Sequence, residues 1–484
     1  MSRIAPFHLE ALGSVLGPSG LIAAPADMAR YERGARHDAG TAAFVARPAA
    51  TEEVSRVVAY CASHSIPLVP QSGNTGLVAG STPDGTSRQG ILSLDRLRGI
   101  FELDAANRSV RVSAGLRLSE INARLAEHGF VFPIDLGADP CAGGMAATNT
   151  GGARFLRFGD VRRNTLGLEV VFADLAGSIQ RFGRGLRKDN TGPDWKQMFI
   201  GTGGAFGVIT ECTFNIERLP RQAATAYLLP AGDDCVMPLL SILEEKAGSY
   251  LSAFESMSGA AMRHALAHMP SLPNPFPAGA IPELVLLVEL TRSWAPREHE
   301  SPLEAVLEAI LSEIWEGPGD LLRDAFVGHP DRMWALRHAL PEGLRSAGYV
   351  VGLDLAFSRE AVMPFRARMR EALPRHFPAA EICDYGHVGD GGLHFNVVLP
   401  RSGDTPAEEA ETLREFVVTA AVEQFGGSFS AEHGLGRRNQ RHYDRYTGEL
   451  AKRLARMFKA HTSPADLGTI RLEGTDYDLE TGNA

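Results

Sequence analysis

Short apolar runs separated by amphipathic stripes dominate the first half of the chain, and this pattern predicts alternating strands and helices. Residues 43–45, 66–69 and 91–94 are apolar runs of strand length. Residues 109–112 alternate polar and apolar side chains, as a half-buried strand does. We therefore expect strands at these four places.

Helices are expected between these runs. Leu118, Ile121 and Leu125 recur at helical spacing within residues 117–128, and Gly129 follows as a stop signal. Thr51 precedes an acidic first turn, so we expect it to be the N-cap of a helix.

The later part of the chain differs in proline content and in the length of its apolar stretches. Residues 221–300 are richer in proline and contain the long apolar stretch 284–290, which places a domain boundary near Leu219-Pro220. A capping box, Thr405-Pro406-Ala407-Glu408, predicts a helix that ends at Gly426-Gly427. The apolar face of that helix would carry Leu413, Phe416, Val417 and Ala420.

Length and composition narrow the class of protein. The 484 residues suggest two or three domains, and 44% hydrophobic and 22% charged residues are typical of a globular protein. The net charge of −10 argues against nucleic acid or an anionic membrane as a partner. No uncharged apolar run is long enough for a membrane span.

The five cysteines are scattered and odd in number, which indicates reduced thiols. The first thirty residues show neither a secretory signal nor the features of a transit peptide. We therefore expect a cytoplasmic protein.

Glycines gather between residues 73 and 207, notably in the loops 70–80, 141–152 and 201–207. Consecutive backbone N–H groups in such loops can hold phosphate oxygens. Phe206 breaks the dinucleotide fingerprint in the third loop, and no loop continues as a P-loop. Each loop alone could be a structural turn, but together they favour a large phosphate-bearing cofactor.

A histidine-containing segment, residues 386–396, carries the clearest chemistry. Asp390-Gly391 is a strong hairpin signal, and a two-residue turn there would place His387 directly opposite His394. Asn396 would share their face. Two surface histidines would be the plain alternative, but Glu432-His433, in a glycine-flanked loop, adds a carboxylate and an imidazole. Two histidines and one carboxylate form a common catalytic metal shell.

Several long strings resemble one family, the FAD enzymes of the vanillyl-alcohol oxidase type, and within it the D-2-hydroxyglutarate and D-lactate dehydrogenase branch. Residues 70–81 are similar to its pyrophosphate loop, and residues 136–152 and 154–159 to its second flavin segment. Residues 186–192 and 207–210 are similar to its third.

The resemblance implies an α+β fold: a PCMH-type FAD-binding domain of two subdomains, plus a cap domain with an antiparallel sheet and flanking helices. The domains would be residues 1–219 for FAD, 220–428 for the substrate and cap, and 429–484 returning to the flavin and metal site. The residues that would contact FAD are Pro70, Gln71, Ser72, Gly73, Asn74, Thr75, Gly76, Gly80, Ser81, Leu136, Gly143, Gly144, Thr148, Asn149, Gly152 and Ile209. The FAD would be non-covalent, with Cys141 the nearest candidate for a covalent link.

For catalysis, the resemblance implies that His387, His394 and Glu432 bind a divalent metal, zinc being our choice, and that His433 accepts the substrate proton. The metal would acidify the 2-hydroxyl, and the C2 hydrogen would leave as hydride to flavin N5. Arg337, in Trp334-Ala335-Leu336-Arg337, would bind the substrate carboxylate, and Asn396 would help orient it. Phe254-Glu255 also resembles a family string, for which we expect a structural role.

This chain departs from the family pattern at five places. Gly203 replaces a usual Glu, residues 467–471 replace the usual ending, and Gly392 replaces an Asn beside the metal motif. Pro341 and Gly352 stand where the hydroxyglutarate enzymes have Thr and Lys, and Arg345 or His338 could replace the missing polar groups. D-2-hydroxyglutarate is the expected substrate on overall resemblance, and the last two departures favour D-lactate or a broad D-2-hydroxy acid specificity as the alternative.

Two other classes of protein remain as alternatives: a zinc hydrolase built on His387, His394 and Glu432, and a non-catalytic FAD or electron-transfer subunit. For the dehydrogenase, an electron-transfer flavoprotein or a quinone is the expected electron acceptor. A homodimer is among the assemblies that the sequence leaves open.

Overall fold

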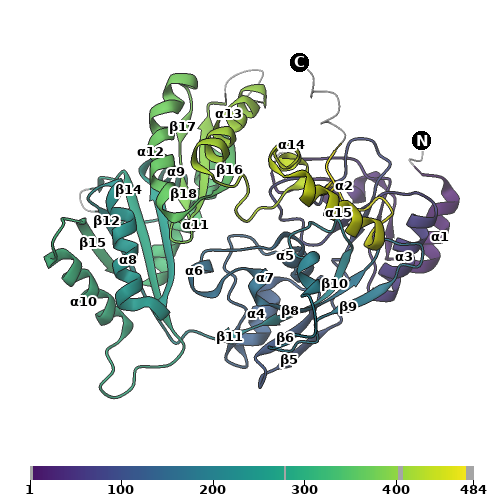
Figure 1. The fold of residues 1–484 in the computed structure, drawn as a ribbon, viewed down its shortest axis with the longest axis horizontal. Helices are drawn as coiled ribbons and strands as arrows, with labels where there is room; N and C mark the ends of the chain where they lie inside the picture. Colours follow the sequence, from purple (N-terminus) through teal and green to yellow (C-terminus); the bar gives the residue numbers. More distant parts are fainter. Residues whose placement is uncertain (1–3, 37, 277–278, 402–406, 476–484) are drawn as a thin grey trace. The chain divides into compact units, whose positions relative to one another are not determined.

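The computed structural model describes residues 4–36, 38–276, 279–401 and 407–475. The chain divides into two compact units, each assembled from segments that are distant in sequence (Figure 1). The first contains residues 1–151, 160–218 and 432–484, and the second contains residues 152–159 and 219–431.

The first unit is built on two main sheets. Within the described residues, one sheet has the strand order β1-β2-β4-β3, in which β2, β4 and β3 are parallel. The other is antiparallel, with the order β5-β6-β10-β8-β9. The strands of this unit are β1 Leu21–Ile22, β2 Phe44–Ala46, β3 Leu68–Gln71, β4 Gly90–Ser93, β5 Phe101–Asp104, β6 Ser109–Ser113, β7 Phe130–Val131, β8 Thr165–Val171, β9 Ile179–Phe182, β10 Val208–Asn215 and β11 Glu217–Arg218.

The helices of the first unit cover these sheets and close two separate cores. They are α1 Pro6–Leu16, α2 Pro25–Glu32, α3 Thr51–Ser63, α4 Leu118–Ala126, α5 Ala142–Thr148, α7 Val161–Asn164, α14 Gly436–Tyr446 and α15 Glu449–Thr462. The C-terminal segment belongs to this unit because Leu467 forms a parallel bridge with Leu68.

The predicted strands of the first unit are confirmed within a residue or two, and so is the helix whose face carries Leu118, Ile121 and Leu125. The prediction that Thr51 is an N-cap is wrong. Thr51 is the first residue of α3, and its hydroxyl donates a hydrogen bond of 2.9 Å to the Glu169 carboxylate. The Thr51 hydroxyl therefore bonds to Glu169 of β8 and does not cap the helix.

The second unit is a mixed layer of sheet and helix (Figure 1). Among its described residues the strand order is β15-β12-β14-β13-β18-β19-β16, with β17 paired to β19, and all pairings are antiparallel. The strands are β12 Gln222–Pro230, β13 Leu251–Ser258, β14 Leu284–Arg292, β15 Leu322–Gly328, β16 Tyr349–Ala356, β17 Glu381–Ile382, β18 Tyr385–Gly386 and β19 Gly392–Leu399.

The helices of the second unit are α6 Phe155–Phe158, α8 Val236–Ala247, α9 Gly259–His268, α10 Leu303–Glu316, α11 Pro330–Ala347, α12 Arg359–His376 and α13 Ala407–Thr419. Helices α9 and α11 pack on the sheet face that carries Tyr227, Met257 and Leu287. They approach each other closely at Gly343, where a Cβ would lie 2.5 Å from the Ala265 Cα. A glycine is therefore needed at this crossing.

The predicted C-terminal helix of the second unit is present, with Leu413 and Val417 buried. Thr405 and Pro406 of its predicted capping box lie outside the described residues. After α13 the chain continues as a π-helix, Ala420–Gln424, before the predicted glycine stop.

Candidate active site

Strand β19 carries His394 at the centre of the site. In the sheet, His394 is directly opposite Asp354 of β16 on one side and Tyr385 of β18 on the other. The Asp354 carboxylate is 5% exposed, and its Oδ1 lies 3.5 Å from His394 Nδ1. Asp354 is an acidic residue inside an otherwise apolar strand, which is costly without charged or polar partners.

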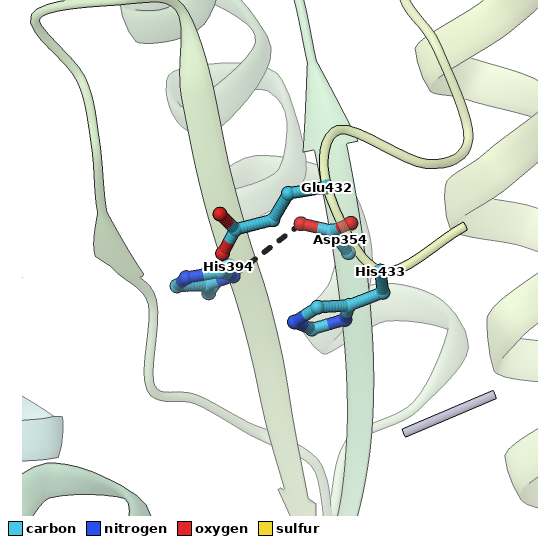
Figure 2. Close-up of side chains that lie close together, drawn as sticks. All are labelled: Asp354, His394, Glu432 and His433. Atoms are coloured by element: carbon cyan, nitrogen blue, oxygen red, sulfur yellow. Dashed lines mark ion pairs between the residues drawn. The ribbon is translucent and has the colours of Figure 1, made fainter. Parts of the chain in front are cut away.

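The segment that leads to Glu432 and His433 is attached to β16, the strand that carries Asp354. Ser428 forms an antiparallel bridge with Ala356, and the Ala431 amide donates a hydrogen bond of 3.2 Å to the Asp354 carbonyl. Asp354, His394, Glu432 and His433 each offer a ligand atom, and these four atoms lie within 4.8 Å of one another (Figure 2). We call these four residues the acid–histidine cluster.

The predicted register of the histidine hairpin is wrong. Tyr385, not His387, pairs with His394, and residues 387–391 form a longer turn. The His387 carbonyl accepts hydrogen bonds from the amides of Asp390 and Gly392. The Asp390 carboxylate also accepts the Gly392 amide at 2.9 Å, which closes the turn with a side chain that a two-residue turn does not use.

His387 nevertheless reaches His394 from this turn. The two Nε2 atoms are 3.2 Å apart, and the rings meet edge to face. Gly392 allows the approach, because a Cβ at this position would lie 3.3 Å from the His387 Cβ and 3.0 Å from Asp390 Oδ1. The structure therefore brings His387 and His394 together through their rings rather than through the strand register.

A buried carboxylate, Glu255 of β13, contacts both His387 and Arg337. His387 Nδ1 lies 2.6 Å from Glu255 Oε1, and Arg337 Nε and Nη2 each lie 2.8 Å from Glu255 Oε2. Burial by itself raises the pKa of Glu255, but the electrostatic interactions and hydrogen bonds with His387 and Arg337 outweigh it and lower the pKa to about 2. Glu255 is therefore a carboxylate at neutral pH.

Arg337 and Trp334 lie on one face of α11, and each meets a different buried glutamate. The Trp334 indole N–H donates to Glu289 of β14 at 2.8 Å, and the Glu289 carboxylate also pairs with Arg154 Nε at 2.9 Å. Arg337 is itself buried and lies over the Tyr385 ring. The Trp-x-x-Arg string is thus fixed to two strands.

The remaining residues named for substrate recognition lie on β19, α11 and β16. Asn396 is buried on β19 and donates to the His394 carbonyl at 3.1 Å. Pro341 lies inside α11, and Gly352 is opposite Asn396 in the sheet. Arg345 is exposed and pairs with Glu342 on its own helix.

The predicted flavin residues lie in the first unit, apart from Gly152. Pro70 and Gln71 end β3, and residues 72–81 form the loop that follows. Gly143, Gly144 and Thr148 lie in α5, and Asn149 ends that helix in a left-handed conformation. Ile209 lies on β10, and Leu136 is in the loop before α5.

The first loop and α5 approach each other closely. A Cβ at Gly73 would lie 3.1 Å from the Cys141 backbone nitrogen, and one at Gly144 would lie 3.5 Å from the Ser72 Cβ. The loop is held by the Gln71 amide, which donates to the Ser81 carbonyl, and by the Ser81 hydroxyl, which donates to Asn74 Oδ1. The loop after β3 and the start of α5 are therefore in direct contact.

Two departures from the family pattern lie next to each other. Gly203 has a φ of +60°, and a Cβ built on it would lie 2.2 Å from Ile470 Cδ1. The C-terminal residue Ile470 therefore occupies the space that a side chain at position 203 would need.

Comparison with known proteins identifies the class. Residues 42–183 match the family model described as FAD binding domain, and residues 163–467 match FAD linked oxidases, C-terminal domain. The chain belongs to this family of FAD-linked oxidoreductases, and the predicted α+β fold class is confirmed. The zinc hydrolase and non-catalytic alternatives are therefore not retained.

Individual relatives refine the picture. The chain is 35% identical over 428 residues to the mitochondrial D-2-hydroxyglutarate dehydrogenase of Rattus norvegicus, covering 88% of this chain and 77% of the relative. It is 30% identical to a D-2-hydroxyglutarate–pyruvate transhydrogenase of Saccharomyces cerevisiae, covering 88% and 85%. A Schizosaccharomyces pombe relative, 33% identical and covering 82% and 75%, is provisionally named a mitochondrial D-lactate dehydrogenase.

Solved structures agree on the fold. p-Cresol methylhydroxylase with substrate bound superposes with a TM-score of 0.73 at 16% identity, covering 95% of this chain and 94% of that one. At that identity the likeness shows the fold alone.

The expectation of a cytoplasmic location is contradicted by the relatives, because those from rat, zebrafish and rice are all named as mitochondrial proteins. Reduced cysteines do not distinguish one reducing compartment from another, so they gave no basis for the choice. Within the described part of the chain, no helix combines the length and the apolar character that crossing a membrane requires.

Sequence reasoning missed two residues of the site. Asp354 had a signal, an acidic residue inside the apolar strand 349–356, but its partner lies forty residues later in the chain. Glu255 had a similar signal within β13, which we interpreted as structural, and its contacts with Arg337 and His387 appear only in three dimensions.

Proposed function

We propose that this chain oxidises a D-2-hydroxy acid to the 2-oxo acid, using FAD and a divalent cation. The observation that carries the proposal is the convergence of His394, Glu432 and His433 with Asp354 (Figure 2). His387 Nε2 lies 3.2 Å from His394 Nε2, next to this cluster. The names of the relatives, D-2-hydroxyglutarate and D-lactate dehydrogenases, support this substrate class.

The donor set fits a divalent cation, with His387, His394 and Glu432 as the proposed ligands. Two imidazole nitrogens bound to one tetrahedral zinc ion lie about 3.4 Å apart, given Zn–N bonds of about 2.0–2.1 Å. The 3.2 Å between the Nε2 atoms of His387 and His394 is close to that spacing. Imidazole and carboxylate donors suit zinc, which is our choice among divalent metals.

The chemistry that the bound groups supply is acceptance of the C2 hydrogen as a hydride by the flavin and polarisation of the substrate hydroxyl by the cation. The proposed role of His433 is to accept the hydroxyl proton on a neutral imidazole nitrogen. Its position in the acid–histidine cluster, beside the proposed ligand Glu432, supports that role.

The proposed role of Arg337 is to bind the substrate carboxylate. Glu255 engages Nε and Nη2, whereas Nη1 makes no hydrogen bond with any described residue and can take a carboxylate oxygen. Asn396, buried beside His394, is proposed to help orient the substrate.

The proposed FAD site is the predicted set in the loop after β3 and around α5, with the cofactor bound non-covalently. The close approach of Gly73 to the neighbouring segment supports it, because a Cβ at this position would lie 3.1 Å from the Cys141 backbone nitrogen and would press on that segment.

The relatives and the residues of this chain favour different substrates. The relatives favour D-2-hydroxyglutarate. The absence of a polar side chain at Pro341 and Gly352 favours D-lactate or a broad specificity, because a distal carboxylate would find no partner there. The proposed electron acceptor is an electron-transfer flavoprotein or a quinone.

Anaerobic reduction of the bound flavin tests the function. The purified flavoprotein is mixed with D- and L-2-hydroxyglutarate, D- and L-lactate and other 2-hydroxy acids, and bleaching is followed by stopped flow. We expect bleaching by D-enantiomers only. The preferred acid is the one, D-2-hydroxyglutarate or D-lactate, whose rate constant of flavin reduction rises more steeply with its concentration. A flavin that no D-2-hydroxy acid bleaches would sink the proposal.

The metal ligands are tested separately by elemental analysis. His387→Ala should lose the metal and retain the flavin spectrum. His264→Ala is a matched control, because His264 lies in a second candidate group with Glu381 and Cys383. Loss of metal from the control, with full occupancy in His387→Ala, would move the site to that second group.

A further inference from the structure

We infer that Glu255 is a positioning residue that orients His387 and Arg337 at the same time, and so joins metal binding to substrate binding. The inference rests on the proposed function, in which these two residues face the metal and the substrate.

The location of Glu255 is unfavourable for a residue without partners. It lies in the middle of β13, every residue of which is buried, and its own side chain is 1% exposed. A buried carboxylate is destabilising unless charges and hydrogen bonds compensate it. Both of its oxygen atoms have partners, and each oxygen serves a different residue.

The first partner fixes the imidazole of His387. Because the carboxylate can only accept, Nδ1 of His387 must carry the hydrogen of the 2.6 Å bond. The neutral ring then has its lone pair on Nε2, the atom that lies 3.2 Å from His394 Nε2. A carboxylate behind a ligating histidine sets the tautomer and ring orientation in this way.

The second partner fixes the guanidinium of Arg337. Nε donates a hydrogen bond to Glu255 Oε2, Nη2 forms an ion pair with the same oxygen, and the guanidinium carbon lies 4.7 Å from the Tyr385 ring centroid. This leaves the Nη1 side for a ligand. Tyr385 in turn is the strand partner of His394, so the contacts form one continuous path from Arg337 to the histidines.

Glu289 shows what a purely anchoring glutamate looks like in the same sheet. It is equally buried, on the neighbouring strand, but it contacts Arg154, Trp334 and Ser252 rather than His387 or Arg337. The two glutamates therefore form a matched pair for experiment.

The test compares Glu255→Gln with Glu289→Gln in the intact flavoprotein after metal removal. Zn²⁺ is titrated back against a fluorescent chelator, which measures metal affinity without turnover. For Glu255→Gln we expect the Zn²⁺ Kd to rise about 10–100-fold, the range seen when such outer-shell partners are removed. We also expect KM for the D-2-hydroxy acid to rise, because Arg337 loses its anchor. For Glu289→Gln, the Zn²⁺ Kd should stay within threefold of the wild-type value.

The outcomes separate this inference from the proposed function. A wild-type protein that takes up no Zn²⁺ would overturn the proposed metal site and this inference together. A wild-type protein that binds Zn²⁺, with a Glu255→Gln Kd within threefold of it, would overturn the inference alone. An equal loss of affinity in both glutamine variants would also overturn it, since the effect would then reflect the fold.

If Glu255→Gln does not accumulate as a folded flavoprotein, Glu255→Asp replaces it. Aspartate keeps the charge but is one methylene shorter, so it cannot reach both partners from the same backbone position. We expect a weakened Zn²⁺ affinity with an unchanged flavin spectrum. An unchanged affinity in Glu255→Asp would equally overturn the inference.

Discussion

His433 and Glu432 are neighbours in the chain, yet the proposed mechanism gives them different roles. Both offer an atom to the acid–histidine cluster. His433 could therefore act as a metal ligand in place of His387, and only metal content combined with rate distinguishes the two assignments.

His433→Ala should retain both metal and FAD and reduce its flavin about 10²–10⁴ times more slowly with a D-2-hydroxy acid, the usual contribution of a general base. Stopped-flow reduction and elemental analysis on the same sample measure both quantities. A His433→Ala protein without metal would show that His433 is a ligand instead.

The cysteines differ in reactivity because four of them are buried. Burial raises the pKa of Cys61 to about 12 and that of Cys141 to about 11. It raises the pKa of Cys212 and Cys383 as well. Cys235 is the partly exposed one.

Iodoacetamide at pH 8 should therefore label Cys235 first in the native protein, because the thiolate is the nucleophile and burial disfavours it. Peptide mass spectrometry after a short exposure measures the order, and labelling in denaturant provides the reference for all five thiols. Early labelling of Cys61 or Cys141 in the native protein would contradict the burial described here.

At the scale of the element, α11 is fixed to the sheet through its Trp334 and Arg337 side chains. Glu289 receives the Trp334 indole and, at the same time, ties Arg154 of the segment 152–159 to β14. Burial alone raises the pKa of Glu289, but the Arg154 charge and the hydrogen bonds from Arg154, Ser252 and Trp334 lower it overall.

Glu289→Gln should lower the stability of the protein by about 2 kcal/mol at pH 7, because the buried ion pair is lost while the hydrogen bonds are partly kept. A lowered pKa makes this contribution fully present above the ordinary carboxyl pKa of about 4.3 and lost as the pH falls through the folded-state value. The difference in melting temperature between wild type and variant should therefore be largest near pH 7 and narrow below about pH 4.

Differential scanning calorimetry at several pH values provides this measurement. Glu298→Gln is the control, since the Glu298 side chain is 91% exposed and its loss should change little. A difference that widens on acidification would contradict the assigned sign.

At the scale of the whole molecule, the chain builds its first unit from three separate segments. The C-terminal residues return to this unit, where Gly436 lies so close to Val78 that a Cβ would be 1.9 Å from the Val78 carbonyl oxygen. The same glycine has a φ of +53°, which other residues adopt only with strain. The loop proposed to hold FAD thus packs against residues that lie more than three hundred positions later in the chain.

FAD should be released by acid precipitation, because the nearest thiol, Cys141, is buried and holds its proton at neutral pH. Precipitation followed by absorbance of the supernatant and the pellet measures the partition. A yellow pellet would indicate covalent attachment.

The sequence by itself determined the cofactor class, the two-subdomain FAD fold and four strands of the first unit, β2, β3, β4 and β6. These follow from local signals: apolar runs of strand length, glycine loops and long strings similar to a known family. It also singled out His387, His394, Glu432 and His433 as residue types suited to one another, although their roles remain proposals.

Only the tertiary structure decided the hairpin register, the place of Asp354 and the contacts of Glu255. The register depends on how the turn 387–391 closes, and the Asp390 side chain altered that closure. Asp354 and Glu255 meet partners 40 and 132 residues away respectively. No periodicity or local propensity encodes such cross-sheet contacts, because strand order and packing determine them.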